Sequence, residues 1–214
     1  MNQLLPGIWT WSIFSKEKGI PFHGWYVQSQ GENIVIDPPT PGEKILQKME
    51  KLGRPSAILL TNKHHTRASE VIRRQFDCSV WIHEKDKKLM EIPIDETFVD
   101  GDLLPGGLKV TTIPDGKTPG ESAFFLVGER RVLFVGDAII GKPPGSVSML
   151  PPEKFKDPVK AKEGLQVLLS LDFDGLLLGD GESIISGGKT ALKVFLSKKT
   201  GIKEKKPSVD SRRV

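Results

Sequence analysis

Two short runs of residues that are apolar from end to end constrain the fold of this chain more than any other feature. They are Ala57–Leu60 and Leu176–Leu178, and each is only long enough for a β-strand. A strand that is apolar on both faces must be covered on both faces. Helical spacing of apolar residues occurs nearby, most clearly in Gly42–Leu52, so we expect helices to pack against the sheets.

The order of the other segments suggests two sheets. Strand-like residues fill 4–37, a strand–helix–strand unit extends to His83, and strand-like runs separated by glycine turns fill 98–137. A helix, a strand and a last helix follow, up to residue 198. This order favours an α/β chain with helices on the outer faces of two sheets. We expect the helix that begins after Asp157, its N-cap, to run to about Leu171.

Length and charge predict one domain with a basic end. The 214 residues fit a single domain, assigned to residues 1–197, and residues 198–214 are expected to form a flexible tail that carries much of the net charge of +4. The tail has no interleaved aromatic residues, so we expect no nucleic-acid partner. No apolar run spans a bilayer and the start of the chain resembles no secretion signal, so we expect a cytoplasmic protein without a membrane partner. The single cysteine, Cys78, excludes an internal disulfide.

Four loops that follow strand-like runs carry a resemblance to a known family. They read Thr61-Asn62-Lys63-His64-His65-Thr66-Arg67, Gly116-Lys117-Thr118-Pro119-Gly120, Gly136-Asp137-Ala138 and Gly179-Asp180-Gly181. In this order they resemble the loops Thr-His-x-His-x-Asp-His, Gly-His-Thr-Pro-Gly, Gly-Asp and Gly-His-Gly of the metallo-β-lactamase superfamily, nearest in style to its glyoxalase II-like hydrolases. The resemblance implies an α/β fold of the four-layer αβ/βα sandwich type.

The same resemblance implies that most of the family's metal ligands are replaced. Family members use seven ligand positions for two zinc ions, and only two of these positions keep the family's residue here, His64 and Asp137. Zinc needs three or four well-placed donors, so we expect no metal cofactor. The seven positions hold Asn62, His64, Thr66, Arg67, Lys117, Asp137 and Asp180.

Arg67 and Lys117 bring positive charge to the place where metal charge would lie. The carboxylates of Asp137 and Asp180 need a compensating charge when they are buried, and charge-assisted hydrogen bonds from these cations can provide it. We therefore predict a pocket rebuilt with organic cations. The alternative is one divalent ion of zinc, iron or manganese, held by His64, Asp137 and Asp180. The Lys117 ammonium argues against this alternative because it would repel the ion.

His64 and His65 are adjacent and cannot point the same way from an extended segment. We expect His64 to face the pocket, whereas a shift of one residue in the loop would bring His65 inward instead. Asn62, His65 and Asp180 are assigned to the ligand-binding surface. Asp37, which ends a strand before Pro38-Pro39, is expected to have a structural role in a turn.

By this resemblance the chain is expected to be a hydrolase-like protein that cleaves a small ester or thioester. Lys117 and Arg67 would stabilise an oxyanion, and His64 or Asp137 would act as the base. The ligand is expected to be a small anionic molecule. The alternative is a non-catalytic protein that binds a small anion, or serves as a scaffold, and retains the fold.

Two segments imitate a phosphate-binding loop because they end in Gly-Lys-Thr. In Ser183–Thr190 the first glycine of the motif is replaced by Ser183, and Thr111–Thr118 leads into Pro119-Gly120, which does not open a helix. We therefore do not expect nucleotide binding. An anion at the N-terminus of the last helix is kept as a minor alternative.

Overall fold

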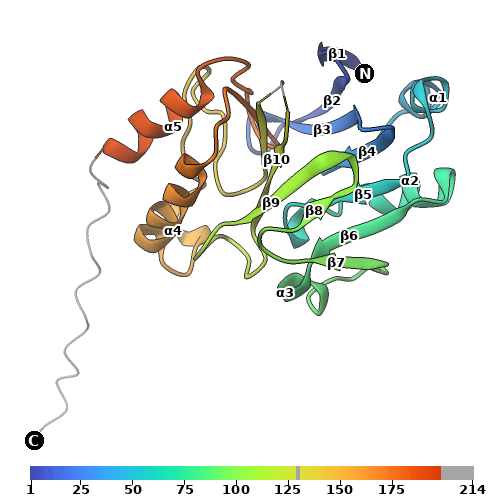
Figure 1. Cartoon of the computed structure of the whole chain (residues 1–214). Helices are drawn as coiled ribbons and strands as arrows, with labels where there is room; N and C mark the ends of the chain where they lie inside the picture. Colours follow the sequence, from blue (N-terminus) through green and yellow to red (C-terminus); the bar gives the residue numbers. More distant parts are fainter. Residues whose placement is uncertain (129–130, 199–214) are drawn as a thin grey trace, which may run out of the picture.

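The computed structural model describes residues 1–128 and 131–198, and over these residues two β-sheets pack face to face with helices on both outer surfaces (Figure 1). Helices α1 and α2 lie on one side of the sheets and α4 and α5 on the other. The four-layer αβ/βα sandwich is therefore confirmed. The predicted tail lies outside the described residues, apart from Lys198.

The first sheet is antiparallel at its N-terminal end and parallel at the other. Strands β1 to β4 pair as successive antiparallel neighbours, and β4 to β7 pair in parallel. Parallel neighbours need a crossover, which α1 (Glu43–Leu52) and α2 (Ser69–Phe76) supply. The strands are β1 (Asn2–Leu5), β2 (Ile8–Ser15), β3 (Ile20–Ser29), β4 (Glu32–Ile36), β5 (Ala57–Leu59), β6 (Ser79–His83) and β7 (Glu96–Phe98).

The second sheet has the order β12-β11-β10-β9-β8, and only its β11–β12 pair is parallel. The crossover between β11 and β12 contains α4 (Pro158–Gly164), and α5 (Gly188–Ser197) follows β12. The short helix α3 (Glu84–Lys87) joins β6 to β7. The strands are β8 (Leu103–Leu104), β9 (Leu108–Thr112), β10 (Ser122–Leu126), β11 (Val132–Val135) and β12 (Gly175–Leu178).

The two wholly apolar runs are covered on both faces, as predicted. In β5 and the residue after it, Ala57 and Leu59 point into the core between the sheets, whereas Ile58 and Leu60 pack under the helices of the first sheet. In β12, Leu177 faces the core between the sheets and its neighbours face the helices of the second sheet. Edge-to-face aromatic contacts fill the centre of the sandwich; they join Trp25 to Phe134 and Phe98 to Phe124.

The helix that begins after Asp157 is shorter than predicted. Asp157 is the N-cap, and its side chain accepts hydrogen bonds from the backbone N–H groups of Val159 and Lys160. However, α4 ends at Gly164, and Leu165–Ser170 forms a 3₁₀ helix. The buried side chains of Leu165 and Leu168 are three residues apart, which suits three residues per turn.

No helix among the described residues is both long enough and apolar enough to cross a bilayer.

Phe124 should be among the residues that stabilise the sandwich most, since its side chain is fully buried between the sheets. We expect Phe124→Ala to lower the free energy of unfolding by about 3–5 kcal/mol, measured by urea denaturation. Phe14 is the matched control because its side chain is 63% exposed, and Phe14→Ala should change the free energy by less than about 0.5 kcal/mol. Equal losses in the two variants would contradict this description of the core.

Candidate functional site

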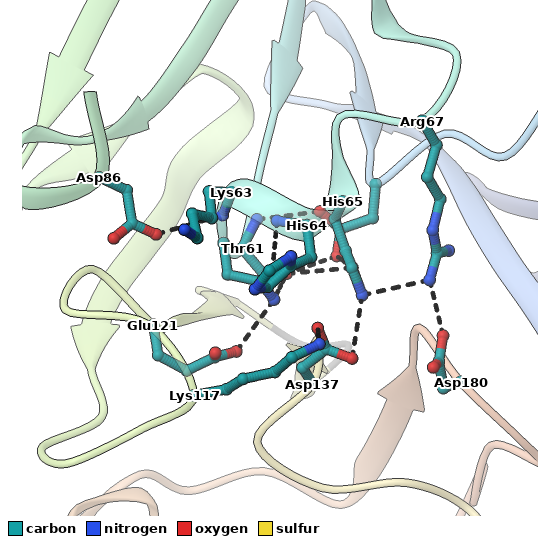
Figure 2. Close-up of polar contacts among 12 residues, drawn as sticks. Thr61, Lys63, His64, His65, Arg67, Asp86, Lys117, Glu121, Asp137 and Asp180 are labelled. Atoms are coloured by element: carbon teal, nitrogen blue, oxygen red, sulfur yellow. Dashed lines mark hydrogen bonds and ion pairs between the residues drawn. The ribbon is translucent and has the colours of Figure 1, made fainter. Parts of the chain in front are cut away.

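The loops singled out from the sequence meet at one edge of the sandwich (Figure 2). Thr61–Arg67 follows β5, Asp137 follows β11 and Asp180 follows β12, while Lys117 lies in the loop between β9 and β10. Strands from both sheets thus end beside one another, and side chains far apart in the sequence come into contact.

Asp37 fixes the first of these loops. Its carboxylate accepts hydrogen bonds from the backbone N–H of Thr61 at 2.9 Å and from the Thr61 hydroxyl at 2.6 Å, and it lies 2.7 Å from Nδ1 of His65. Asp37 is 1% exposed and its φ of 48° lies in the left-handed region. Asp37 has a structural role, as predicted. It acts through its side chain, which orients His65.

Both histidines line the cavity, His64 as expected, but His65 is the one whose side chain is buried. His65 is 1% exposed and its Nε2 lies 3.5 Å from Oδ1 of Asp137, whereas His64 is exposed and its ring lines the mouth of the cavity. Lys63–His65 is a 3₁₀ turn that the Asn62 side chain caps by accepting a hydrogen bond from the backbone N–H of His64. Successive side chains of such a turn diverge by about 120°, so the extended segment assumed from the sequence does not apply.

His65 carries a positive charge at neutral pH. Burial and the Arg67 charge lower its pKa, but the carboxylates of Asp37 and Asp137 outweigh both and raise it to about 10. Nη2 of Arg67 approaches Nε2 of His65 to 3.2 Å. When the ring is protonated, Nε2 of His65 and Nη2 of Arg67 are both hydrogen-bond donors. The carboxylates of Asp137 and Asp180 offset the repulsion between these two cations.

Lys117 and Arg67 each bind a buried carboxylate (Figure 2). Nζ of Lys117 donates to Oδ2 of Asp137 at 2.6 Å, and Nη2 of Arg67 donates to Oδ1 of Asp180 at 2.7 Å. Burial alone would raise the pKa of Asp137, but His65 and Lys117 hold it well below its usual value. The Arg67 guanidinium also lies over the Phe22 ring, 4.6 Å from its centroid.

Asn62 and Glu121 form a buried contact behind the cavity. Nδ2 of Asn62 donates to Oε1 of Glu121 at 3.1 Å, and both side chains are fully buried. Burial and the neighbouring Asp137 raise the pKa of Glu121 well above its usual value. The structure thus places Asn62 beneath the cavity surface, not on it. Sequence reasoning missed Glu121, although an acidic residue directly before the apolar run of β10 was a signal.

A cavity of about 350 Å³ opens above these groups. Its walls combine cations with one buried carboxylate, Asp137, and the Phe22 ring. Lys18, His64 and Lys117 also border a second, larger cavity of about 880 Å³. Of the predicted site residues, the small cavity brings together His64, His65, Arg67, Lys117 and Asp137.

His65, Asp137 and Asp180 are the described residues that could hold a metal ion, since each has a potential ligand atom within 4.8 Å of the others'. The cations do not leave these atoms free. Arg67 lies within 3.2 Å of Nε2 of His65 and binds Asp180, and Lys117 binds Asp137. An ion here would lie beside a guanidinium and an ammonium, so the donor set as arranged does not fit the family's metal centre.

The Asp174 side chain lies beside the loop that leads into α5. The Asp174 carboxylate accepts hydrogen bonds from the backbone N–H of Gly187 at 2.8 Å and from the Ser186 hydroxyl at 2.9 Å. These contacts fix the loop that leads into α5. The minor alternative of an anion at the N-terminus of the last helix stays a prediction.

Comparisons with known proteins agree with this architecture. A family model described as the metallo-beta-lactamase superfamily matches residues 1–198. A comparison with curated proteins yields no match. Among solved structures, TTHA1623 in a di-iron-bound form is 25% identical with a TM-score of 0.66, covering 84% of this chain and 96% of that one.

Two further structures are less similar in sequence and support the fold alone. The metallo-beta-lactamase family protein TTHA1429 from Thermus thermophilus is 19% identical with a TM-score of 0.67, covering 90% of this chain and 79% of that one. A metallo-beta-lactamase from Pontibacter korlensis is 18% identical with a TM-score of 0.71, covering 90% of this chain and 94% of that one.

Removal of the Lys117 charge should destabilise the protein through Asp137. We expect Lys117→Met to lower the free energy of unfolding at pH 7 by about 3 kcal/mol, because a buried carboxylate loses one of its two cations. The double variant Lys117→Met/Asp137→Asn should recover part of this loss, measured by urea denaturation. A double variant less stable than Lys117→Met would show that the pair does not act in this way.

The stability of the protein should also decline at alkaline pH. The pKa of His65 is raised in the folded protein, so its contribution is complete below about pH 6.5 and is lost as pH rises towards about 10. The urea midpoint should therefore fall over this range, and His65→Gln should reduce the fall. His83→Gln is the control, since His83 is also buried but its pKa is lowered, chiefly by burial. An unchanged slope in His65→Gln would contradict the assignment.

Proposed function

The chain belongs to the metallo-beta-lactamase superfamily, and from the arrangement of its site we propose that it is a metal-independent member that hydrolyses a small anionic ester or thioester. One observation carries this proposal. Lys117 and Arg67 bind the carboxylates of Asp137 and Asp180 at the edge where the strands end, and they line the same cavity as His64.

The two cations would do the electrostatic work that metal ions do in other members. One structural neighbour was solved in a di-iron-bound form, and bound metals polarise a carbonyl group and activate water. In this chain the Lys117 ammonium has further N–H donors besides the one bound to Asp137, and Nη1 of Arg67 has no hydrogen-bond partner among the described residues. The further ammonium donors of Lys117 would be available to a carbonyl oxygen that becomes negative in the transition state, whereas Nη1 of Arg67 is shielded from solvent.

His64 is the best-placed base. Its ring lies at the mouth of the cavity, and burial and the Lys117 charge lower its pKa, which keeps the ring neutral at pH 7. Asp137 is a poor base because two cations already bind its carboxylate. His64 would accept a proton from water as the water oxygen attacks the carbonyl carbon. The intermediate then collapses, the bond to the leaving group breaks, and the imidazolium returns the proton to the alkoxide or thiolate.

Charge also supports an anionic substrate. Lys18, Arg67 and Lys117 line the cavity, and the buried Asp137 is the one carboxylate among the described residues that line it. A second carboxylate or a phosphate on the substrate would be attracted to this wall. The ion pairs of Lys117 and Arg67 also support an alternative to catalysis. Because both cations already have carboxylate partners, the pocket could bind a small anion without turnover.

Purified protein should hydrolyse a small anionic thioester or aryl ester at a rate that survives dialysis against a chelator. Lys117→Met should lower kcat/KM by about 10²-fold or more, because an oxyanion donor is lost, and His64→Gln by about 10²-fold. Lys109→Met, which removes an exposed lysine of β9, should retain the wild-type rate.

Metal bound in a stoichiometric amount, with turnover abolished by the chelator, would overturn the proposal. Saturable binding of the anion without turnover would favour the non-catalytic alternative.

A further inference from the structure

We infer that Asp86, which lies outside the cavity, is a positioning residue that holds Lys117 in place for hydrolysis. The inference rests on the function proposed above. Asp86 belongs to the short helix α3, between β6 and β7, and sequence reasoning did not single it out. It is the one buried residue of this helix and is fully shielded from solvent.

The contacts of Asp86 join the two loops that form the cavity. Oδ2 accepts hydrogen bonds from the backbone N–H of Lys63 at 3.1 Å and from the Thr118 hydroxyl at 2.6 Å, and Oδ1 accepts one from the backbone N–H of Gly120 at 2.8 Å. Lys63 directly precedes the histidine pair, and Thr118 directly follows Lys117. One carboxylate therefore fixes the loop after β5 against the loop before β10; Figure 2 shows its contact with Lys63.

Asp86 differs from the buried carboxylates of Asp137 and Asp180. Among the described residues it has no ion-pair partner within 4.0 Å, whereas Asp137 binds Lys117 and Asp180 binds Arg67. A carboxylate without a cation costs free energy to bury unless several donors satisfy it. All three groups that donate hydrogen bonds to Asp86 belong to the two cavity loops. The burial of Asp86 therefore depends on the position of these loops, and the position of the loops depends on Asp86.

The fit around Gly120 makes this attachment tight. A Cβ atom at Gly120 would lie 2.8 Å from Cβ of His83 and 2.9 Å from Cγ of Asp86, closer than real contacts allow. The backbone of the loop therefore presses against α3, with no side chain between them. At Gly116, on the other side of Lys117, a Cβ would lie 2.4 Å from Cβ of Glu121. Lys117 is thus held by packing on one side and by Asp86 on the other.

This placement has a chemical consequence for Lys117. Its Nζ reaches Asp137 at 2.6 Å from a loop of the second sheet, while His64 and His65 come from the first sheet. The distance between oxyanion donor and base therefore depends on how the two loops are fixed to each other. A misplacement of about 1 Å can lower a rate by about 10²-fold. Asp86 would act through Lys117, without touching the substrate.

The test uses Asp86→Asn, in which one acceptor oxygen becomes an N–H₂ group that faces the loop donors. Its kcat/KM for the thioester or ester should fall by about 10- to 100-fold. In the Lys117→Met background the same change should have no further effect, because Asp86 acts through Lys117. Asp102→Asn is the control; Asp102 accepts a hydrogen bond from the backbone N–H of Val99 in a turn away from the site and should leave kcat/KM unchanged.

A second measurement does not depend on turnover. Reaction of Lys117 with acetic anhydride, followed by mass spectrometry of the folded protein, should be slow in the wild type because Asp137 binds the ammonium. It should be several-fold faster in Asp86→Asn and unchanged in Asp102→Asn. If Asp86→Asn does not fold, Thr118→Val removes one of the three hydrogen bonds and should give the same changes to a smaller degree.

Two results would overturn the inference. One is that the losses of kcat/KM caused by Asp86→Asn and Lys117→Met multiply in the double variant. The other is that the rate at which Lys117 is labelled does not change in Asp86→Asn. A wild-type protein without turnover would contradict the proposed function, and the labelling would still decide whether Asp86 positions Lys117.

Discussion

The buried carboxylate of Asp137 is the group on which the arrangement of the site depends. It lies at the end of β11, between the imidazolium of His65 and the ammonium of Lys117, and both cations are needed to offset its burial. The same need for compensation explains the neighbouring contacts. Asp180 binds Arg67, and Asp37 binds the other side of the His65 ring. Each of these three carboxylates faces a cation, so this edge of the sandwich stays ordered in a low-dielectric environment.

The site is also where the two sheets are joined by polar contacts. Arg67 of the first sheet's loop reaches Asp180 after β12, Asn62 reaches Glu121 before β10, and Asp86 receives donors from both loops. Elsewhere the sheets meet through apolar packing, which is strong but not directional. Hydrogen bonds between the sheets therefore determine the geometry of the cavity, and a change on either side of it is transmitted to the cations.

Much of the site could be predicted from the chain because its residues follow strand ends in a recognisable order. From the sequence we predicted that Lys117 and Arg67 would compensate the buried carboxylates of Asp137 and Asp180, and in the structure each cation binds one of them. The burial of His65 was not predictable, because it depends on an unrecognised 3₁₀ turn capped by Asn62. Glu121 and Asp86 were missed. The position of Glu121 directly before β10 was a signal, whereas Asp86 lies in a segment of charged residues that gives no signal of burial.

By itself the sequence determined the layered fold, because strands that are apolar on both faces have few ways to exclude water. It also determined which charged side chains lie at the strand ends. The tertiary structure alone decided which partner each of them has. The Arg67–Asp180 pair joins residues separated by more than a hundred positions, and the contacts of Asp86 depend on the approach of Gly120 to α3. Such pairings depend on the distance between the two sheets. The packed core sets this distance, and no local segment of the sequence does.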